Sequence, residues 1–339
     1  MKAMRQTLTA WLKFAVALSV LVSLTSRADN AGGTPEAQAW LTKIQTAAQR
    51  LNYSGTFVYQ QGSQMRTSRI THLLEGGTEI EKLEILDGNP REYIRKNDEV
   101  ICYVPETRTL QVEKRVSRDA FPAILGASPA ELAQHYHIRK AETGRIAGHD
   151  CQAIILEPKD KLRYGYKLWA EKSSGLLLRA QTLNDRAEVV EQIAFTQVAI
   201  GNVDRSRVNP SYVNTAGWRV EHAVTTPANL HGWTVGGLPP GFRKVRELKR
   251  VVSDGPADGA TNVPQTAGRE IGQMIFSDGL AAISVFIEPG SYSRTEGTLQ
   301  QGALNILGKR YGDYWLTIVG EVPSAAIRQV ANSIEYQPK

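Results

Sequence analysis

Signatures of catalysis are missing from this sequence. No HExxH, GxSxG, P-loop or paired zinc-ligand motif occurs, and no spacing links its Ser, His and Asp residues into a triad. The two cysteines form no CxxC, so the sequence offers no sign of a redox site. We therefore interpret the chain as non-enzymatic and expect no cofactor and no metal. A hydrolase of envelope lipids is the enzymatic alternative, and it would need a nucleophile.

Long hydrophobic runs are also missing, apart from one near the N-terminus. Phe14–Leu24 is about 11 residues long, which suits the apolar region of a secretory signal and is too short to span a bilayer. Cations precede it, and Ser26-Arg27-Ala28 places small residues at positions −3 and −1 of a cleavage site. This pattern predicts a signal peptide over residues 1–28, cleaved after Ala28, and export to the periplasm. A transmembrane anchor is the alternative.

Positive charge is less abundant than the total suggests. The net charge is +6, but Lys2, Arg5, Lys13 and Arg27 all lie in the predicted signal, which contains no acidic residue. The exported chain therefore carries about +2. So small a charge leaves no electrostatic footprint for nucleic acid, and we expect no nucleic-acid partner.

Length and composition predict two globular domains. The chain has 339 residues, with hydrophobic and charged contents of 42% and 22%, as in an ordinary globular protein. The segment 201–217 is polar and lacks periodicity, which is typical of a connection. We expect a large domain at 29–203, a linker at 204–217 and a second domain at 218–339.

The large domain is predicted to be one antiparallel sheet around helices. Apolar residues at helical spacing follow Thr34-Pro35, and the Ser128–Glu131 capping box predicts a short helix over Pro129–His137. Alternating segments between turn residues predict strands. They are Gly55–Gln60, Met65–Leu74, Glu79–Leu86, Arg91–Arg95, Glu99–Val104, His149–Glu157, Arg163–Glu171, Leu176–Leu183 and Glu188–Val198. A sheet of this size twists and curls, so we expect a half-open barrel.

The second domain is predicted to be smaller and of mixed composition. Ser277-Asp278-Gly279 joins two apolar segments as a hairpin, and Pro323–Ser333 has the apolar stripe of a closing helix. Arg243–Val252 is expected to be a charged strand, and Ser253–Gly268 a loop. The predicted fold class is therefore α+β, with a large curved antiparallel sheet and a smaller α+β C-terminal domain.

Cysteine and histidine suggest two sites, each with a plainer alternative. Cys102 and Cys151 lie in predicted strands, and in an oxidising compartment such a pair predicts a disulfide. Closing a loop of about 50 residues would stabilise the fold by roughly 4 kcal/mol in the chain-entropy model. Two buried, unpaired thiols are the alternative. His135 and His137 lack a third ligand, so we interpret them as surface residues and not as metal ligands.

Aromatic residues interleave with aliphatic ones on the predicted curved sheet. An apolar concavity binds acyl chains through buried area, so these residues are candidates for a ligand cavity. Packing of the domain's own core is the alternative. The candidates are Phe57, Tyr59, Tyr93, Tyr103 and Trp169.

Cations are concentrated early in the second domain. They are Arg219, Arg243, Lys244, Arg246, Lys249 and Arg250. A solvated edge strand protected by charge is one explanation. A docking face for an acidic peptide, which could also add a strand to an exposed edge, is the other.

Several strings resemble one family of periplasmic proteins. They are SGTFVYQ (54–60), EPKDKLRYGYKLWAEKSSGLLLRAQ (157–181), GWTVGGLPPGF (232–242), FSDGLAAISVFIEP (276–289) and LTIVGEVPSAAIRQVANSIEY (316–336). With the exported N-terminus, they cover nearly the whole mature chain in order. On these residues the chain resembles the RseB/MucB family, periplasmic regulators of the envelope-stress (sigma-E type) sigma factor.

The resemblance implies a fold and a function. In the fold it implies, the larger domain is a half-barrel like the lipoprotein carriers of the outer-membrane pathway. The smaller domain, with help from the larger, binds the periplasmic segment of a membrane-embedded anti-sigma factor and shields it from regulated proteolysis. The resemblance also implies relief by a lipid-like or lipopolysaccharide-derived signal, and a homodimer or higher oligomer. A periplasmic carrier or chaperone for lipoproteins or lipids is the alternative function.

Overall fold

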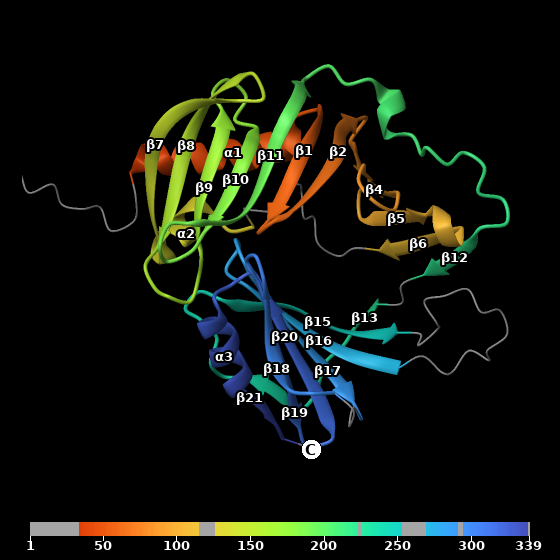
Figure 1. Cartoon of the computed structure of the whole chain (residues 1–339), viewed down its shortest axis with the longest axis vertical. Helices are drawn as coiled ribbons and strands as arrows, with labels where there is room; N and C mark the ends of the chain where they lie inside the picture. Colours follow the sequence, from red (N-terminus) through yellow and green to blue (C-terminus); the bar gives the residue numbers. More distant parts are fainter. Residues whose placement is uncertain (1–33, 115–125, 223–224, 253–268, 291–293, 338–339) are drawn as a thin grey trace, which may run out of the picture. The chain divides into compact units, whose positions relative to one another are not determined.

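The computed structural model describes residues 34–114, 126–222, 225–252, 269–290 and 294–337. Residues 31–339 form one compact unit. The predicted signal peptide (1–28) and the predicted loop Ser253–Gly268 lie outside the described residues. Most of the described chain is strand, with few helices (Figure 1).

A sheet of twelve strands occupies the first two thirds of the chain, in the order β12-β6-β5-β4-β3-β2-β1-β11-β10-β9-β8-β7. Its strands are β1 (Tyr53–Gln61), β2 (Gln64–Glu75), β3 (Thr78–Ile85), β4 (Arg91–Lys96), β5 (Glu99–Val104), β6 (Thr109–Lys114), β7 (Tyr136–Ile146), β8 (His149–Pro158), β9 (Gly165–Glu171), β10 (Leu177–Leu183), β11 (Val189–Ile200) and β12 (Arg219–His222). Neighbouring strands are antiparallel, except that β12 runs parallel to β6. The large antiparallel sheet predicted from the sequence is confirmed.

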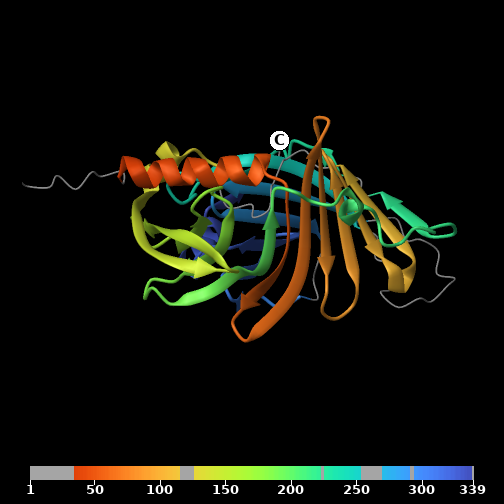
Figure 2. The same cartoon turned by 90° about the horizontal axis from the view of Figure 1, so that it is seen from above.

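Two helices pack against this sheet. In α1 (Pro35–Arg50) the Thr34 hydroxyl caps the first turn by accepting from the Ala37 amide at 3.3 Å. The buried stripe of α1 crosses the strands at the β7–β11 end, where it contacts β7, β8 and β10 (Figures 1 and 2). The short α2 (Pro129–His135) has the predicted capping box, with reciprocal bonds between Ser128 and Glu131.

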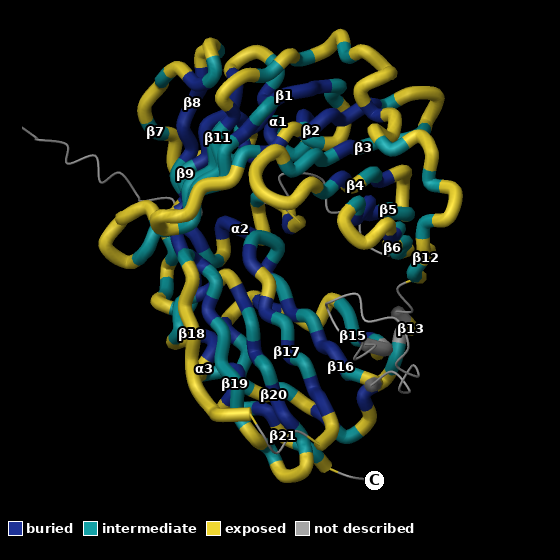
Figure 3. The backbone as a smooth tube through the Cα atoms, turned by 45° about the vertical axis from the view of Figure 1, so that its right-hand side comes forward, coloured by how far each residue is buried: buried dark blue, intermediate teal, exposed yellow. Residues whose placement is uncertain are grey.

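The core between helices and sheet is made of aliphatic residues and two tyrosines. It comprises Ala37, Leu41, Ile44, Ala127, Leu132, Ala133, Tyr136, Ile138, Ile154, Leu156, Tyr166, Leu168, Ala170 and Leu177. Buried residues lie along the strands and exposed ones at the turns (Figure 3). Helix α2 ends two residues earlier than predicted, because Tyr136 and Ile138 turn their side chains into this core as the first residues of β7.

The second sheet has seven strands in the order β13-β15-β16-β17-β20-β19-β18. They are β13 (Thr225–Pro227), β15 (Arg243–Val252), β16 (Arg269–Ser277), β17 (Ala282–Pro289), β18 (Gly297–Gln301), β19 (Leu304–Tyr311) and β20 (Tyr314–Gly320). Helix α3 (Ser324–Asn332) buries Ala326, Ile327, Val330 and Ala331, and a small pair, β14 (Trp233–Val235) with β21 (Ile334–Tyr336), adjoins it. Gly279 has φ +92°, so the predicted Asp-Gly hairpin is confirmed.

The α+β prediction is only partly met, because helices are few in both parts of the described chain. One strand also lies elsewhere than expected. β12 follows the predicted domain boundary at 218, yet it pairs with β6 in the large sheet. Among the helices that the structure describes, no helix is both long and apolar enough to cross a bilayer.

Candidate functional site

One face of the β1–β5 region carries a cross-strand row of mostly apolar residues. The strand register places Gly55, Ile70, Leu83, Tyr93 and Cys102 directly opposite one another on successive strands. Residues in register share a face of a sheet. We call this row, together with Phe57 and Tyr59 of β1, the apolar row face.

Three of the predicted ligand residues belong to the apolar row face. Phe57 and Tyr59 alternate with Gly55 on β1, so they share the face with Tyr93. Phe57 and Trp169, 5% and 8% exposed, pack in one core cluster, and Tyr59 packs against it. Core packing therefore accounts for Phe57 and Trp169, whereas Tyr93 is 37% exposed and presents its ring to solvent.

Tyr103 does not lie on the apolar row face. It stands opposite Glu92, on the other face of the sheet. There its ring stacks on Tyr212 at 6.0 Å and meets Trp218 edge-on at 6.4 Å. The placement of Tyr103 in the same cavity as Tyr93 is therefore wrong, because successive residues of a strand point to opposite faces.

The predicted linker runs along the face that holds Tyr103. The Lys82 ammonium lies 3.0 Å from a Glu92 oxygen and donates to the Asn209 carbonyl at 2.8 Å and the Ser211 hydroxyl at 2.9 Å. The Ser211 amide donates to the Glu92 carboxylate at 3.0 Å. Both charged side chains are almost fully buried, at 6% and 4% exposure. The polar composition of the linker thus reflects bonds to the sheet and not only contact with water.

The predicted disulfide is not formed. Cys102 and Cys151 are buried free thiols on β5 and β8, and seven strands lie between them in the sheet. A disulfide needs Cα atoms within about 7 Å, whereas neighbouring strands alone are about 4.8 Å apart. Burial raises the pKa of the Cys151 thiol to about 11, which suits an inert core residue.

The basic residues of the second domain are divided between two sheets. Arg219 lies exposed on β12 of the large sheet, paired with Glu221 at 2.7 Å. The other five cations lie on β15 of the second sheet. β15 is not a free edge strand, because β13 pairs with Leu248–Arg250 and β16 pairs along its whole length.

Carboxylates already neutralise three cations of β15. Arg243 pairs with Glu131 at 3.2 Å, Lys244 with Glu247, and Lys249 with Glu270. Arg246 and Arg250, both half-buried, alternate with Leu248 and so share the other face of the strand from Lys249. Arg250 Nε is buried and has no hydrogen-bond partner among the residues that the structure describes. The cations best placed to receive an acidic partner are therefore Arg246 and Arg250.

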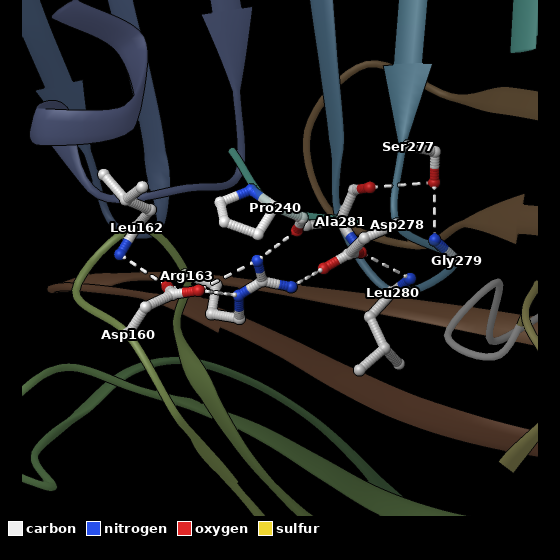
Figure 4. A network of polar contacts seen from close by, with 9 residues as sticks. All are labelled: Asp160, Leu162, Arg163, Pro240, Ser277, Asp278, Gly279, Leu280 and Ala281. Carbon is white, nitrogen blue, oxygen red and sulfur yellow. Dashed lines mark hydrogen bonds and ion pairs between the residues drawn. The ribbon is translucent and has the colours of Figure 1, made fainter. Parts of the chain in front are cut away.

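A buried polar network joins the loop before β9 to the second sheet, and the sequence reading missed it. The Arg163 guanidinium donates to the Asp160 carboxylate, to Asp278 Oδ2 at 2.8 Å and to the Pro240 carbonyl (Figure 4). The side chains of Arg163 and Asp278 are 0% and 1% exposed. No sequence motif marks this network, because Arg163 and Asp278 are 115 residues apart in the chain. We call it the Arg163 junction.

The described residues contain no group of three or more His, Cys, Asp or Glu side chains arranged to hold a metal ion. His135 lies close to the backbone of Gly241. Burial, followed by the nearby Arg163 charge, lowers its pKa. His135 therefore packs against the second sheet.

Comparisons with known proteins agree with this architecture. The model of the MucB/RseB N-terminal domain matches residues 36–212, and that of the MucB/RseB C-terminal domain matches residues 227–335. Sigma-E factor regulatory protein RseB of Haemophilus influenzae is 26% identical over 96% of this chain and 98% of its own length. Sigma factor AlgU regulatory protein MucB of Pseudomonas aeruginosa is 28% identical over 88% and 90%.

Solved structures of MucB complexes are also similar to this chain over most of its length. The crystal structure of MucB in complex with MucA(peri) has a TM-score of 0.67 at 26% identity and covers 89% of this chain and all of that chain. A second structure, the Pseudomonas aeruginosa MucA/MucB complex, has a TM-score of 0.68 and covers 90% of this chain. Because the two domain models together match most of the chain, in order, this chain belongs to the MucB/RseB family.

Proposed function

We propose that this protein is a non-enzymatic negative regulator of the envelope stress response in the periplasm. It binds the periplasmic part of a membrane-embedded anti-sigma factor and shields that part from regulated proteolysis. The observation that carries the proposal is the match of both family domains, in order, to one chain. The relatives named as regulators of sigma factors, and the solved complexes of MucB with MucA, support the same class of partner.

The partner surface we propose is the face of β15 that bears Arg246 and Arg250. Half-buried guanidinium groups bind carboxylates strongly, and within the described part of the chain Arg250 Nε has no hydrogen-bond partner. Arg243, Lys244 and Lys249 are already paired, so an acidic segment gains less by displacing their carboxylates. The exposed Arg219 provides a matched control on the other sheet.

Release by a lipid-like signal is the second part of the proposal. The apolar row face provides buried aliphatic side chains and, at Tyr93, an exposed aromatic ring, which suits an acyl chain. A ligand there weakens partner binding only if it prefers the partner-free state. The half-barrel likeness to lipoprotein carriers, export after Ala28 and assembly into a homodimer or higher oligomer complete the proposal.

Binding and protection test the proposal together. Residues 29–339 are mixed with the purified periplasmic segment of the anti-sigma factor from the same genome. Affinity is measured, and so is cleavage of the segment by the protease that begins the regulated proteolysis. Arg246→Glu and Arg250→Glu should each weaken binding about 5- to 150-fold, the range of a coupling worth one to three kcal/mol, and restore cleavage. Arg219→Glu should change little. Absence of binding by the wild-type protein would refute the proposal.

The apolar row face also favours a second candidate, a periplasmic carrier or chaperone for lipoproteins or lipids. Because β12 belongs to the large sheet, the informative truncation keeps residues 29–222. A carrier should retain lipid transfer in this form, whereas a regulator should lose tight binding to the anti-sigma segment.

A further inference from the structure

The charged side chains of the Arg163 junction are all paired. The guanidinium contacts Asp160, Asp278 and Pro240, and its Cζ lies 5.6 Å and 5.8 Å from the ring centroids of Tyr136 and Phe242. Planar guanidinium groups suit such combined ionic and stacking contacts, which a lysine ammonium does not reproduce. The Arg163 side chain therefore contacts both sheets: Tyr136 at the start of β7 in the large sheet, and Asp278 in the turn between β16 and β17 of the second sheet.

Asp278 accepts hydrogen bonds both from Arg163 and from the backbone of its own turn (Figure 4). Its Oδ2 accepts from Arg163, and its Oδ1 accepts from the Leu280 and Ala281 amides at 2.9 Å each. These two amides form the turn between β16 and β17. The carboxylate therefore ties the shape of this turn to the position of Arg163.

Apolar packing beside the ion pair is reciprocal. Leu162 precedes Arg163 and packs against the core of the second sheet, while Leu280 packs against the core beneath α1 and α2. The Gly126 amide donates to the Gly279 carbonyl at 2.6 Å, and Asn305 donates to the Tyr164 hydroxyl at 3.1 Å. Separating the two sheets at this point would expose both leucines and a buried ion pair together.

The junction is adjacent in sequence to the proposed partner strand. β15 begins at Arg243, just after two residues that contact Arg163. The Pro240 carbonyl accepts from the guanidinium, and the Phe242 ring lies beneath it. Arg163 in turn lies between β8 and β9 of the large sheet. A shift at the end of either of these strands is therefore transmitted to the start of β15 through one buried side chain.

We propose that Arg163 is a positioning residue, which holds the start of β15 against the large sheet and so orients the Arg246 and Arg250 face for its partner. The role in partner binding rests on the proposed function, whereas the positioning itself does not. A junction with one closed arrangement and one water-filled, open arrangement is the kind of two-state element through which a ligand on one sheet alters affinity on another.

Hydrogen exchange tests the positioning without any partner. In full-length mature Arg163→Met, exchange at the Phe242, Leu280 and Ala281 amides should rise by at least about tenfold, as expected for local opening. Reference amides in the cores, at Ile154 and Val285, should keep their protection, which distinguishes local release from general destabilisation. Asp278→Asn retains an oxygen for the two turn amides, removes the charge facing Arg163, and provides the test if Arg163→Met does not fold.

Arg139→Met is the matched control. Like Arg163, Arg139 pairs with a carboxylate, that of Glu157, but its side chain is about half exposed. It should leave exchange at the junction unchanged. Unchanged exchange at Phe242 and Leu280 in folded Arg163→Met or Asp278→Asn would overturn the proposal.

Affinity for the anti-sigma segment is measured with the same variants. Arg163→Met should lose about tenfold or more, within the usual range of coupling, and Arg139→Met should bind like the wild type. A released β15 with unchanged affinity would overturn the role in partner binding. If the wild-type protein binds no such segment, the proposed function fails, and the exchange result still decides whether Arg163 positions β15.

Discussion

The buried Lys82–Glu92 pair gives a direct measure of how firmly the linker is held to the large sheet. Replacing Lys82 by Met removes one charge from a pair whose side chains are 6% and 4% exposed. Among the described residues, Glu92 then keeps only the Ser211 amide as a donor, and the Asn209 carbonyl loses the Lys82 donor. An uncompensated buried charge of this kind costs about 3–5 kcal/mol of unfolding free energy.

The companion variant removes the second charge as well. In Lys82→Met with Glu92→Leu no buried charge is left unpaired, so the loss should fall to about 1–2 kcal/mol, the cost of the unsatisfied linker groups. The coupling between the two sites should therefore be at least about 2 kcal/mol. Arg139→Met, at the half-exposed pair with Glu157, should cost about 0–1 kcal/mol.

Urea unfolding followed by tryptophan fluorescence is the assay, because Trp218 directly follows the linker and its ring packs on Tyr212 of the linker. A midpoint shift without a change in slope identifies a loss of stability in the folded state. A loss under 1 kcal/mol for Lys82→Met alone, or a double variant as unstable as the sum of its singles, would refute this account of the linker.

Three further predictions concern single residues. Burial works to raise the pKa of Glu171, but hydrogen bonds from the two serines that follow outweigh it and lower the pKa to about 2. The stabilisation from Glu171 is therefore complete above the pKa of the unfolded state, about 4.3, and is lost as the pH falls towards 2. The difference in unfolding free energy between the wild type and Glu171→Gln should shrink over that range. A difference that stays constant with pH would contradict this prediction. Gly279→Ala should destabilise more than Gly312→Ala, since both have positive φ but only at Gly279 would a Cβ lie 2.2 Å from a neighbouring atom; equal melting temperatures would argue against the clash. Cys102 and Cys151 should react with Ellman's reagent only after unfolding, without any reductant, and failure of either to react in denaturant would mean that it is oxidised.

The two sheets put the proposed ligand and the proposed partner on separate surfaces. The apolar row face belongs to the large sheet, and the Arg246 and Arg250 face belongs to the second. For a ligand on one sheet to regulate a partner on the other, some contact between the sheets must differ in free energy between the ligand-free and the ligand-bound protein. The Arg163 junction and the bound linker are two connections among the described residues that carry buried charge.

Local chemistry made much of the fold predictable. The Ser128–Glu131 capping box and the Asp278-Gly279 turn appear where the sequence indicates them, because each depends on residues within four positions of one another. Strands with clear alternation, such as β9 and β11, were located to within a few residues for the same reason. β7 was missed, since its first residues continue the pattern of the helix before it.

The sequence by itself determined the family, the large antiparallel sheet and most of its turns, because these depend on neighbouring residues and on strings that extend along the whole chain. Only the tertiary structure decided which distant residues meet. It separated Cys102 from Cys151 by seven strands and put Tyr103 on the face opposite Tyr93. It also brought Arg163 to Asp278 across 115 residues, and such a pairing has no local signature because strand order and burial determine it together.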